Sequence, residues 1–229
     1  MKINLIGPSY PFRGGISHYT TILFKNLKKK HQTKFYSFKR QYPWFLFPGK
    51  TDKDLSNVSL KDVDTQPILD SLNPFTWIRV AIKAINDKPD LTIFPWWVIF
   101  WVPQFITIIF ILKIFSSTKI LFICHNVVEH EASFIKKIFS KMVLSKGDFF
   151  IVHSNEEKKR LIDLIGERNI TETFHPTYKE FNAEDIPKNK AKEKLGIKDK
   201  NIILFFGFVR EYKGLKYLIE AMPKILEEL

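Results

Sequence analysis

Residues suited to binding a phosphate group stand in a glycine-containing turn near the start of the chain. The turn, Gly7–Gly15, follows an apolar run and leads into a segment with helical spacing, and it ends with Gly14 and Gly15 side by side. Paired glycines let the backbone approach a ligand closely, and the free amides at the start of a helix attract anions. By itself, a loop without a ligand explains this turn equally well. It lacks the G-x-G-x-x-G spacing of dinucleotide-binding proteins, and no acidic residue follows the second apolar run, so an NAD site is disfavoured.

A second glycine turn, Leu204–Leu215, brings two cations into the same kind of position. An apolar run ends at Gly207, and Arg210 and Lys213 precede a further segment with helical spacing. Two such cations match the charge of a diphosphate and can stabilise the charge that develops on a departing nucleoside diphosphate. A solvated basic loop would be the favoured interpretation if this turn stood alone.

The apolar runs of the chain are short, and most are separated by segments long enough for helices. This alternation predicts an α/β fold in which a parallel sheet is covered by helices on both faces. After the first run, Ile16, Tyr19, Leu23 and Leu27 form a helical stripe that is expected to face the core. The expected strands are Ile3–Ile6, Lys34–Phe38, Leu91–Phe94, Lys119–Cys124, Asp148–Val152 and Thr171–His175.

The domain organisation is indicated by changes in composition. Residues 39–73 interrupt the pattern with an aromatic, proline-containing segment and a polar stretch, which either forms a lid over a substrate or packs as a loop on its own domain. Residues 201–207 predict a strand and residues 215–226 a helix, and one strand with one helix cannot bury its apolar faces alone. We therefore expect a complete domain at 1–180, a linker at 181–200 and the start of a second domain at 201–229.

The chain is strongly basic, with a formal net charge of +12 and a pI near 9.6. This excess favours an anionic partner, and nucleic acid, an acidic membrane surface or a phosphorylated substrate would each satisfy it. No nucleic-acid-binding motif accompanies the charge, so nucleic acid is not expected as a partner. Cys124 is the only cysteine, which excludes a disulfide framework and a zinc cluster and favours a reducing cytoplasm.

Residues 91–112 form an uncharged apolar run that is long enough to span a bilayer, for which about 20 residues suffice. Pro95 and Pro103 interrupt the run, and the preceding Lys88-Pro89-Asp90 is typical of a turn into a buried parallel strand. From Val98 on, apolar residues recur at helical spacing. We expect a buried strand followed by a helix, with a membrane-embedded protein that spans at 91–112 as the alternative.

Five short motifs occur in an order that resembles a known family. They are the Gly14-Gly15 turn, His125-Asn126 and His153-Ser154 after two successive apolar runs, His175-Pro176, and the block Gly207–Gly214. Together they resemble the retaining GT-B glycosyltransferases of family four, also called glycosyl transferase group 1, over the whole chain. The resemblance implies two facing Rossmann-like domains with donor and acceptor in the cleft between them, the second domain being truncated here.

The resemblance also implies roles for single residues. The glycine pair would approach the phosphate or sugar of the donor, and the two cations of the second turn would grip its diphosphate. His125 would hydrogen-bond near the transferred sugar, although a strand-end residue that caps local backbone is the alternative for it. Ser154 is instead expected to cap a helix that begins near Asn155. The implied catalytic residues are His125, Arg210 and Lys213, and the implied donor-binding residues are Gly14, Gly15, Gly207, Arg210 and Lys213.

The chain departs from this family in two ways. Many members place the arginine directly after the glycine, whereas Phe208 follows Gly207 here and the arginine is Arg210. The pair of glutamates that the family associates with the donor would lie beyond Leu229. We therefore expect a truncated chain that is inactive by itself, with a non-catalytic acceptor-binding domain as a further alternative.

The function implied by the resemblance is the transfer of a sugar from a nucleotide-diphosphate sugar to a glycan or a lipid-linked acceptor, with retention of configuration. No cofactor and no metal are expected, because Arg210 and Lys213 supply the positive charge. Asp62-Val63-Asp64 spells the D-x-D with which glycosyltransferases of another fold hold a divalent cation. It lies in a polar stretch without a preceding apolar run, so no metal site is predicted.

A membrane surface is a candidate partner of the segment Phe134–Val143. Its apolar residues recur at helical spacing and are flanked by lysines, which is typical of a helix on an anionic membrane, and Lys28-Lys29-Lys30 would add charge. An ordinary helix that packs its apolar side into the domain fits the pattern as well. We expect a cytoplasmic protein, with a peripheral position on the inner face of the membrane as a candidate location.

Overall fold

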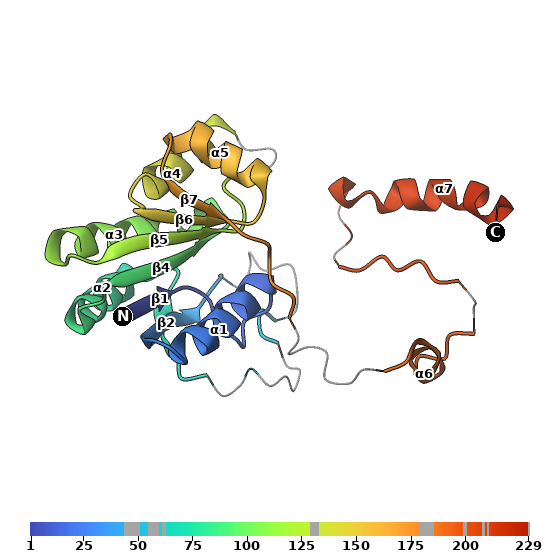
Figure 1. The fold of residues 1–229 in the computed structure, drawn as a ribbon, viewed down its shortest axis with the longest axis horizontal. Helices are drawn as coiled ribbons and strands as arrows, with labels where there is room; N and C mark the ends of the chain where they lie inside the picture. Colours follow the sequence, from blue (N-terminus) through green and yellow to red (C-terminus); the bar gives the residue numbers. More distant parts are fainter. Residues whose placement is uncertain are drawn as a thin grey trace. The chain divides into compact units, whose positions relative to one another are not determined.

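The computed structural model describes residues 1–43, 51–54, 60, 63–128, 133–178, 186–198, 201–207, 209 and 211–228. The chain divides into two compact units, Met1–Phe181 and Asn182–Leu229, and each is considered by itself (Figure 1). The linker and domain limits expected from composition stay predictions.

The first unit is built on a parallel sheet of seven strands in the order β3-β2-β1-β4-β5-β6-β7 (Figure 1). The chain starts at the centre of the sheet, moves outward to β3, and then returns beside β1 and steps outward to β7. In open α/β sheets, ligands bind at the carboxyl ends of the strands where the strand order reverses, which here is between β1 and β4. The strands are β1 (Lys2–Ile6), β2 (Gln32–Arg40), β3 (Gln66–Asp70), β4 (Leu91–Trp96), β5 (Lys119–Cys124), β6 (Phe149–Val152) and β7 (Asn169–Glu172).

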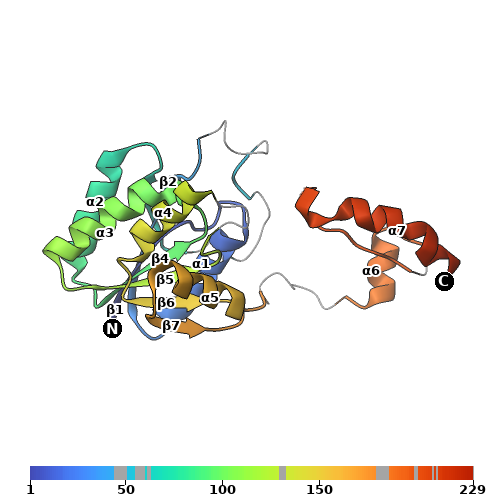
Figure 2. The same cartoon turned by 90° about the horizontal axis from the view of Figure 1, so that it is seen from above.

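Helices cover both faces of this sheet, as predicted. On one face lies α1 (Gly15–Lys28), whose Tyr19 and Phe24 pack with Leu5 and Phe35 of the sheet. Four helices cover the other face, and each packs against the next along the row (Figure 2). They are α2 (Pro74–Asp87), α3 (Val102–Phe115), α4 (Phe134–Leu144) and α5 (Asn155–Ile165).

The strands expected in the first unit are present, with two differences from the prediction. The sequence did not predict β3, a five-residue strand at the sheet edge that contains Pro67, a residue tolerated in strands mainly at edges. The strand expected at Thr171–His175 begins instead at Asn169 and ends at Glu172, because Glu172 pairs with Val152, the last residue of β6. Residues 44–50, which hold most of the aromatic segment expected either as a lid or as a packed loop, lie outside the described residues.

The apolar run at 91–112 does not form one element. It contains β4, the 3₁₀ turn η2 (Ile99–Trp101) and most of α3, and β4 is paired on both sides, with β1 and with β5. Among the described residues, no helix is both long enough and apolar enough to cross a membrane. The expected strand and helix are therefore present, and the membrane-spanning alternative is not favoured.

The second unit contains α6 (Lys188–Lys194), the 3₁₀ turn η4 (Glu211–Lys213) and α7 (Leu215–Glu227). The helix predicted at 215–226 is thus present, but the predicted strand at 201–207 is not. A strand needs a neighbour for its backbone groups, and no described residue of this unit pairs into a sheet.

Candidate functional site

Three histidines meet at the carboxyl edge of the sheet. His125 directly follows β5, His153 directly follows β6, and His175 lies shortly after β7. Their ring centroids are 5.2 Å apart for His125 and His153, 5.1 Å for His153 and His175, and 6.0 Å for His125 and His175. Tyr19 of α1 contacts all three rings, at 4.7 Å, 5.6 Å and 5.2 Å in the same order of histidines. Loops far apart in the sequence therefore build one aromatic cluster, which we call the histidine cluster.

The hydrogen bonds of these rings determine which nitrogen carries the proton. Nδ1 of His153 lies 3.2 Å from the carbonyl oxygen of Thr173, and Nδ1 of His175 lies 3.2 Å from that of Pro176. A carbonyl only accepts, so Nδ1 must be the donor in both rings, and Nε2 of each neutral ring is an acceptor. Nε2 of His175 has Tyr178 Oη at 3.3 Å. Nε2 of His153 is buried and has no hydrogen-bond partner among the described residues, and the same is true of Nε2 of His125.

Burial favours the neutral form of two rings of the cluster, His125 and His153. Burial lowers the pKa of His125 from 6.5 to about 3, and the neighbouring His153 and His175 add to the shift because like charges repel. Burial also lowers the pKa of His153, against the opposing effect of its bond to the Thr173 carbonyl. Neutral imidazoles with unpartnered nitrogens suit hydrogen bonds to hydroxyl groups, since buried polar atoms are rarely left without a partner.

The loop that carries His125 is fixed from two sides. The His125 amide donates to the Trp96 carbonyl at 2.8 Å, and the Trp96 indole donates to the Val127 carbonyl at 3.1 Å. The Val127 amide donates to the Glu157 carboxylate of α5. Ser154 caps α5 by accepting a hydrogen bond from the Glu157 amide at 3.2 Å, which confirms the predicted cap. The Glu157 side chain holds the His125 loop, a role that the sequence did not reveal.

The Gly14-Gly15 turn lies next to the histidine cluster. Tyr178 connects the two, since its hydroxyl lies 3.4 Å from the Gly15 carbonyl oxygen as well as beside His175. Gly14 has φ 120° and ψ 151°, a conformation almost restricted to glycine, and α1 begins directly after it. A Cβ atom added to Gly14 or to Gly15 would meet nothing within 4 Å. The backbone here therefore borders open space that a ligand can enter.

The rest of this turn is braced against the body of the unit. The Tyr10 amide donates to Thr21 Oγ1 at 2.8 Å, and the Arg13 amide donates to the Asp52 carbonyl at 2.7 Å. Nε2 of His18 in α1 lies 3.5 Å from the Asp54 carboxylate, and burial lowers the pKa of His18 against the opposing effect of the Asp54 charge. The turn is thus held by α1 and by residues 51–54.

The second unit holds the other predicted site residues. Gly207 has φ 115°, and Lys213 Nζ lies 3.0 Å from the position that a Cβ on Gly207 would occupy. The lysine therefore folds back over the glycine. Arg210 lies outside the described residues, so its predicted role stays a prediction.

The structure brings His125, Gly14 and Gly15 together in one unit and Gly207 and Lys213 together in the other. It adds two residues that the sequence did not assign to a site, Tyr19 and Tyr178. Tyr19 was placed in a core stripe, and no signal in the sequence distinguishes a tyrosine that packs in the core from one that contacts histidines.

The structure describes only part of the D-x-D tripeptide, Val63 and Asp64. Asp62 lies outside the described residues, and Asp64 pairs with Lys28 at 3.4 Å on an exposed surface. Within the described ranges, no group of three or more His, Cys, Asp or Glu side chains is arranged to hold a metal ion.

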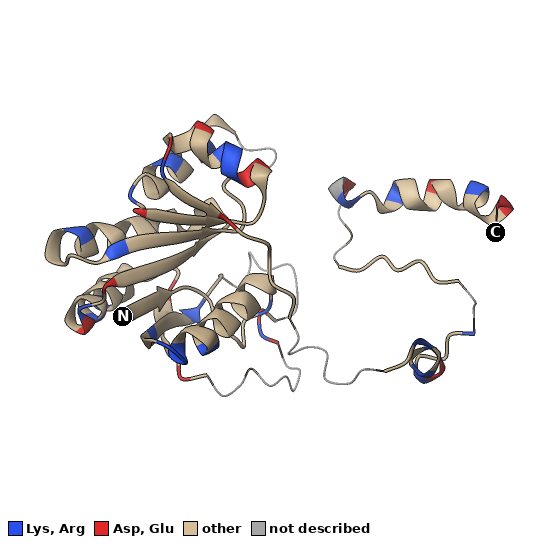
Figure 3. Ribbon diagram, in the orientation of Figure 1, with Lys and Arg blue, Asp and Glu red and all other residues tan. Residues whose placement is uncertain are grey.

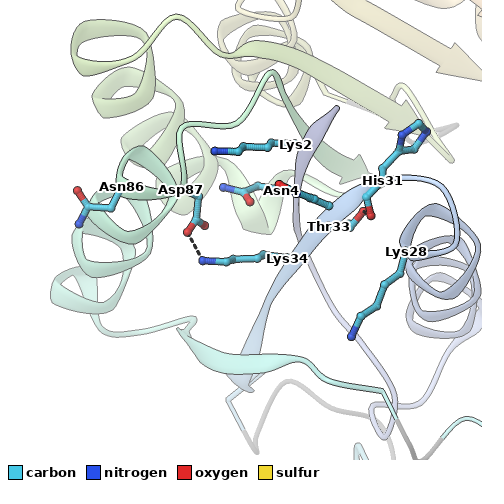
Figure 4. Close-up of a pocket in the computed structure, with 9 residues that line it drawn as sticks. Lys2, Asn4, Lys28, His31, Thr33, Lys34, Asn86 and Asp87 are labelled. Atoms are coloured by element: carbon cyan, nitrogen blue, oxygen red, sulfur yellow. Dashed lines mark hydrogen bonds and ion pairs between the residues drawn. The ribbon is translucent and has the colours of Figure 1, made fainter.

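A cavity of about 570 Å³ lies at the amino edge of the sheet, the edge opposite the histidine cluster (Figure 4). Asp87 in this cavity pairs with Lys34 and accepts a hydrogen bond from Tyr36, so its carboxylate is engaged within the chain. We assign the cavity no role. Its lining residues are Lys2, Asn4, Lys28, His31, Gln32, Thr33, Lys34, Asn86 and Asp87.

No protein-family profile and no curated protein matches this sequence. Among solved structures, the chain is similar to UDP-N-acetylglucosamine 2-epimerase from Rickettsia bellii, with 13% identity, a TM-score of 0.55 and coverage of 100% of this chain and 59% of that chain. Sucrose-phosphate synthase from Thermosynechococcus elongatus is more distant, with 15% identity, a TM-score of 0.45 and coverage of 86% and 99%. A structure of trehalose-6-phosphate from E. coli bound with UDP-2-fluoro glucose has 12% identity, a TM-score of 0.45 and coverage of 86% and 54%.

At this level of identity, the likeness to the epimerase concerns the fold alone. Together with the seven-stranded parallel sheet of the first unit, it confirms the expected α/β fold, a Rossmann-like parallel sheet of the GT-B type. The chain spans 59% of the length of that epimerase.

Proposed function

We propose that this chain belongs to a GT-B glycosyltransferase and that its site binds a nucleoside-diphosphate sugar. The observation that carries the proposal is the pair of neutral histidines with unpartnered Nε2 atoms, His125 and His153, near the open Gly14-Gly15 turn. Unpartnered imidazole nitrogens suit the hydroxyls of a sugar, and the amides at the start of α1 suit a phosphate. The epimerase of similar fold is named for a UDP sugar, which belongs to the same class of ligand.

Each group has a distinct role in the proposed reaction. His125 and His153 hydrogen-bond to the sugar through Nε2, while Gly14 and Gly15 lie against the phosphate. Lys213, with Arg210, neutralises the charge that develops on the departing nucleoside diphosphate, which stabilises the transition state more than the ground state. A hydroxyl of a glycan or lipid-linked acceptor then attacks the sugar from the face that the diphosphate leaves, so that configuration is retained.

The proposed reaction needs no divalent cation and no cofactor, because the lysine and the arginine supply the positive charge. Nucleotide-sugar binding that persists unchanged in EDTA supports this part of the proposal. Binding that is lost in EDTA and restored by magnesium contradicts it, without affecting the assignment of the histidines.

Calorimetric titration of the full chain with UDP, GDP, ADP and their glucose derivatives tests the site directly. We expect one nucleotide sugar to bind, and we expect His125→Gln to weaken it about tenfold through the loss of one shielded hydrogen bond. Gly15→Val should abolish binding without lowering the melting temperature, because the added side chain enters open space. His31→Gln is the matched control, since this histidine lies at the opposite edge of the sheet. No binding to any member of the panel, or equal effects of the two histidine changes, contradicts the proposed site.

The diphosphate role of the second unit has its own matched pair of variants. Lys213→Gln is expected to weaken UDP binding, because its ammonium lies over the Gly207 turn. Lys216→Gln removes the same charge from α7, where the side chain is exposed and lies 3.8 Å from Glu220, and should leave binding unchanged. Equal affinities of the two variants would remove Lys213 from the site.

Sugar transfer is measured with the same panel, through release of the nucleoside diphosphate in the presence of glycan or lipid-linked acceptors. Transfer that His125→Gln reduces supports a catalytic domain. If the chain binds an acceptor but neither binds a nucleotide sugar nor transfers a sugar, the non-catalytic acceptor-binding alternative is favoured.

A further inference from the structure

Helix α4 turns its apolar side away from the sheet. Its buried side chains are Ser140, Val143 and Leu144. Ile135 and Ile138, on the opposite side of the helix, are 62% and 49% exposed. Val143 and Leu144 thus pack into the core, whereas most of the predicted apolar stripe faces outward, which packing into the domain does not explain.

The two helices that precede α4 in the row, α2 and α3, also carry exposed apolar side chains. Phe75 at the start of α2 is 81% exposed, and Phe110 of α3 is 64% exposed. Many exposed large apolar side chains on neighbouring helices are typical of an interaction surface. The exposed apolar side chains of this surface, which we call the α2–α4 face, are Phe75, Ile78, Ile82, Phe110, Ile114, Phe115, Phe134, Ile135, Ile138, Phe139 and Met142.

The charges on the α2–α4 face are almost all positive. The three helices contain a single acidic residue, Asp87, which is the last residue of α2 and pairs with Lys34. The next helix of the row, α5, differs on both counts, because it carries Glu156, Glu157 and Asp163 and no exposed large apolar side chain (Figure 3). The basic residues of the three helices are Arg79, Lys83, Lys113, Lys136, Lys137 and Lys141.

We propose that the α2–α4 face docks on the surface of an anionic lipid bilayer. Exposed Phe and Ile side chains insert at the boundary of headgroups and acyl chains, while flanking lysines keep their ammonium groups at the anionic headgroups. The net charge of +12 favours the same encounter at longer range. The inference concerns a surface away from the histidine cluster and does not depend on the proposed sugar transfer.

Charge complementarity favours a bilayer over a second copy of the chain. Two copies joined through this face would bring their lysines together, and like charges brought close repel. Lysine is also depleted in the cores of protein interfaces, whereas it is typical of helices that lie on membranes.

Vesicle flotation of the full chain tests the proposal. We expect no binding to phosphatidylcholine vesicles, binding to vesicles that contain about one-third phosphatidylglycerol, and weaker binding as salt is raised. Lys137→Gln combined with Lys141→Gln is expected to lower the partition coefficient about 25-fold, at about fivefold for each lysine near the surface. Lys158→Gln with Lys159→Gln is the matched control, because it removes the same charge from α5 and should change binding no more than about twofold.

A variant that lacks two of the exposed apolar side chains distinguishes insertion into the bilayer from charge attraction alone. Ile135→Ser with Ile138→Ser should also release the protein from the vesicles, and the melting temperature should not fall because both side chains are exposed. Absence of binding to anionic vesicles, or equal losses from the α4 and α5 lysine pairs, overturns the proposal. A third result would also overturn the proposal. If the wild type does not bind vesicles but self-associates in sedimentation, and the double serine variant does not self-associate, the α2–α4 face binds a second copy of the chain.

Discussion

Acidification is expected to destabilise the first unit through His125. Burial lowers its pKa to about 3 in the folded chain, while the unfolded chain regains the ordinary value of 6.5. Between these two values the unfolded state binds the proton and the folded state does not, so stability falls as the pH falls. The contribution of neutral His125 to the free energy of unfolding is fully present above the unfolded pKa. As the pH falls below that value, the contribution decreases until the folded ring also protonates.

The size of the effect follows from the two pKa values. Between about pH 7.5 and about pH 5, the difference in proton binding lowers the free energy of unfolding by about 2 kcal/mol for this one ring. His125→Gln has no proton to bind, so its free energy of unfolding should fall by about 2 kcal/mol less than that of the wild type over this range. His153, whose pKa is also lowered, should leave part of the slope in the single variant.

Urea denaturation followed by tryptophan fluorescence measures this difference. All five tryptophans lie in the first 101 residues, and Trp96 is buried and bonded to the loop that follows His125, so fluorescence reports the unit that holds the cluster. Tyr19→Phe is the control, because it alters the same cluster without removing a histidine and should keep the wild-type slope. The same loss of stability in the wild type and in His125→Gln would refute the buried, neutral state of this ring.

Three further outcomes are expected from the packing of the first unit. Ser154→Ala should lower the free energy of unfolding by about 1 kcal/mol through loss of the α5 cap, measured by urea denaturation. Gly147→Ala should destabilise by about 1–3 kcal/mol, because its Cβ would lie 2.5 Å from Phe150, whereas Gly15→Ala should be neutral in the same assay. Cys124 is fully buried and burial raises its pKa, so iodoacetamide should alkylate the chain only under unfolding conditions, as mass spectrometry would show; rapid labelling of the native chain would contradict this packing.

Local regularities in the sequence were enough to predict the fold class. Alternating apolar runs and helix-length segments indicate a parallel sheet covered on both faces, because each element must bury an apolar side. The 91–112 run was correctly predicted to form a strand followed by a helix, although Pro95 lies within β4 and Pro103 within the first turn of α3. The cap at Ser154 was equally readable, since it depends only on neighbours in the chain.

Features that depend on distant partners were not predictable in this way. The edge strand β3 has a short, proline-containing sequence, and its strand character comes from pairing with β2. The opposite error occurred at residues 201–207, where an apolar run without a described pairing partner forms no strand. Backbone pairing, and not the local pattern, determines whether such a run becomes a strand.

The same distinction between local pattern and distant partners applies to the functional residues. The sequence by itself determined that histidines follow successive strands and that α4 has an apolar side with flanking lysines. Only the tertiary structure decided that Tyr19 and three histidines share one cluster, and that most of the apolar side of α4 faces outward. The reason is that burial and the pKa values that it shifts are properties of the space around a side chain, which is filled by residues far away in the sequence.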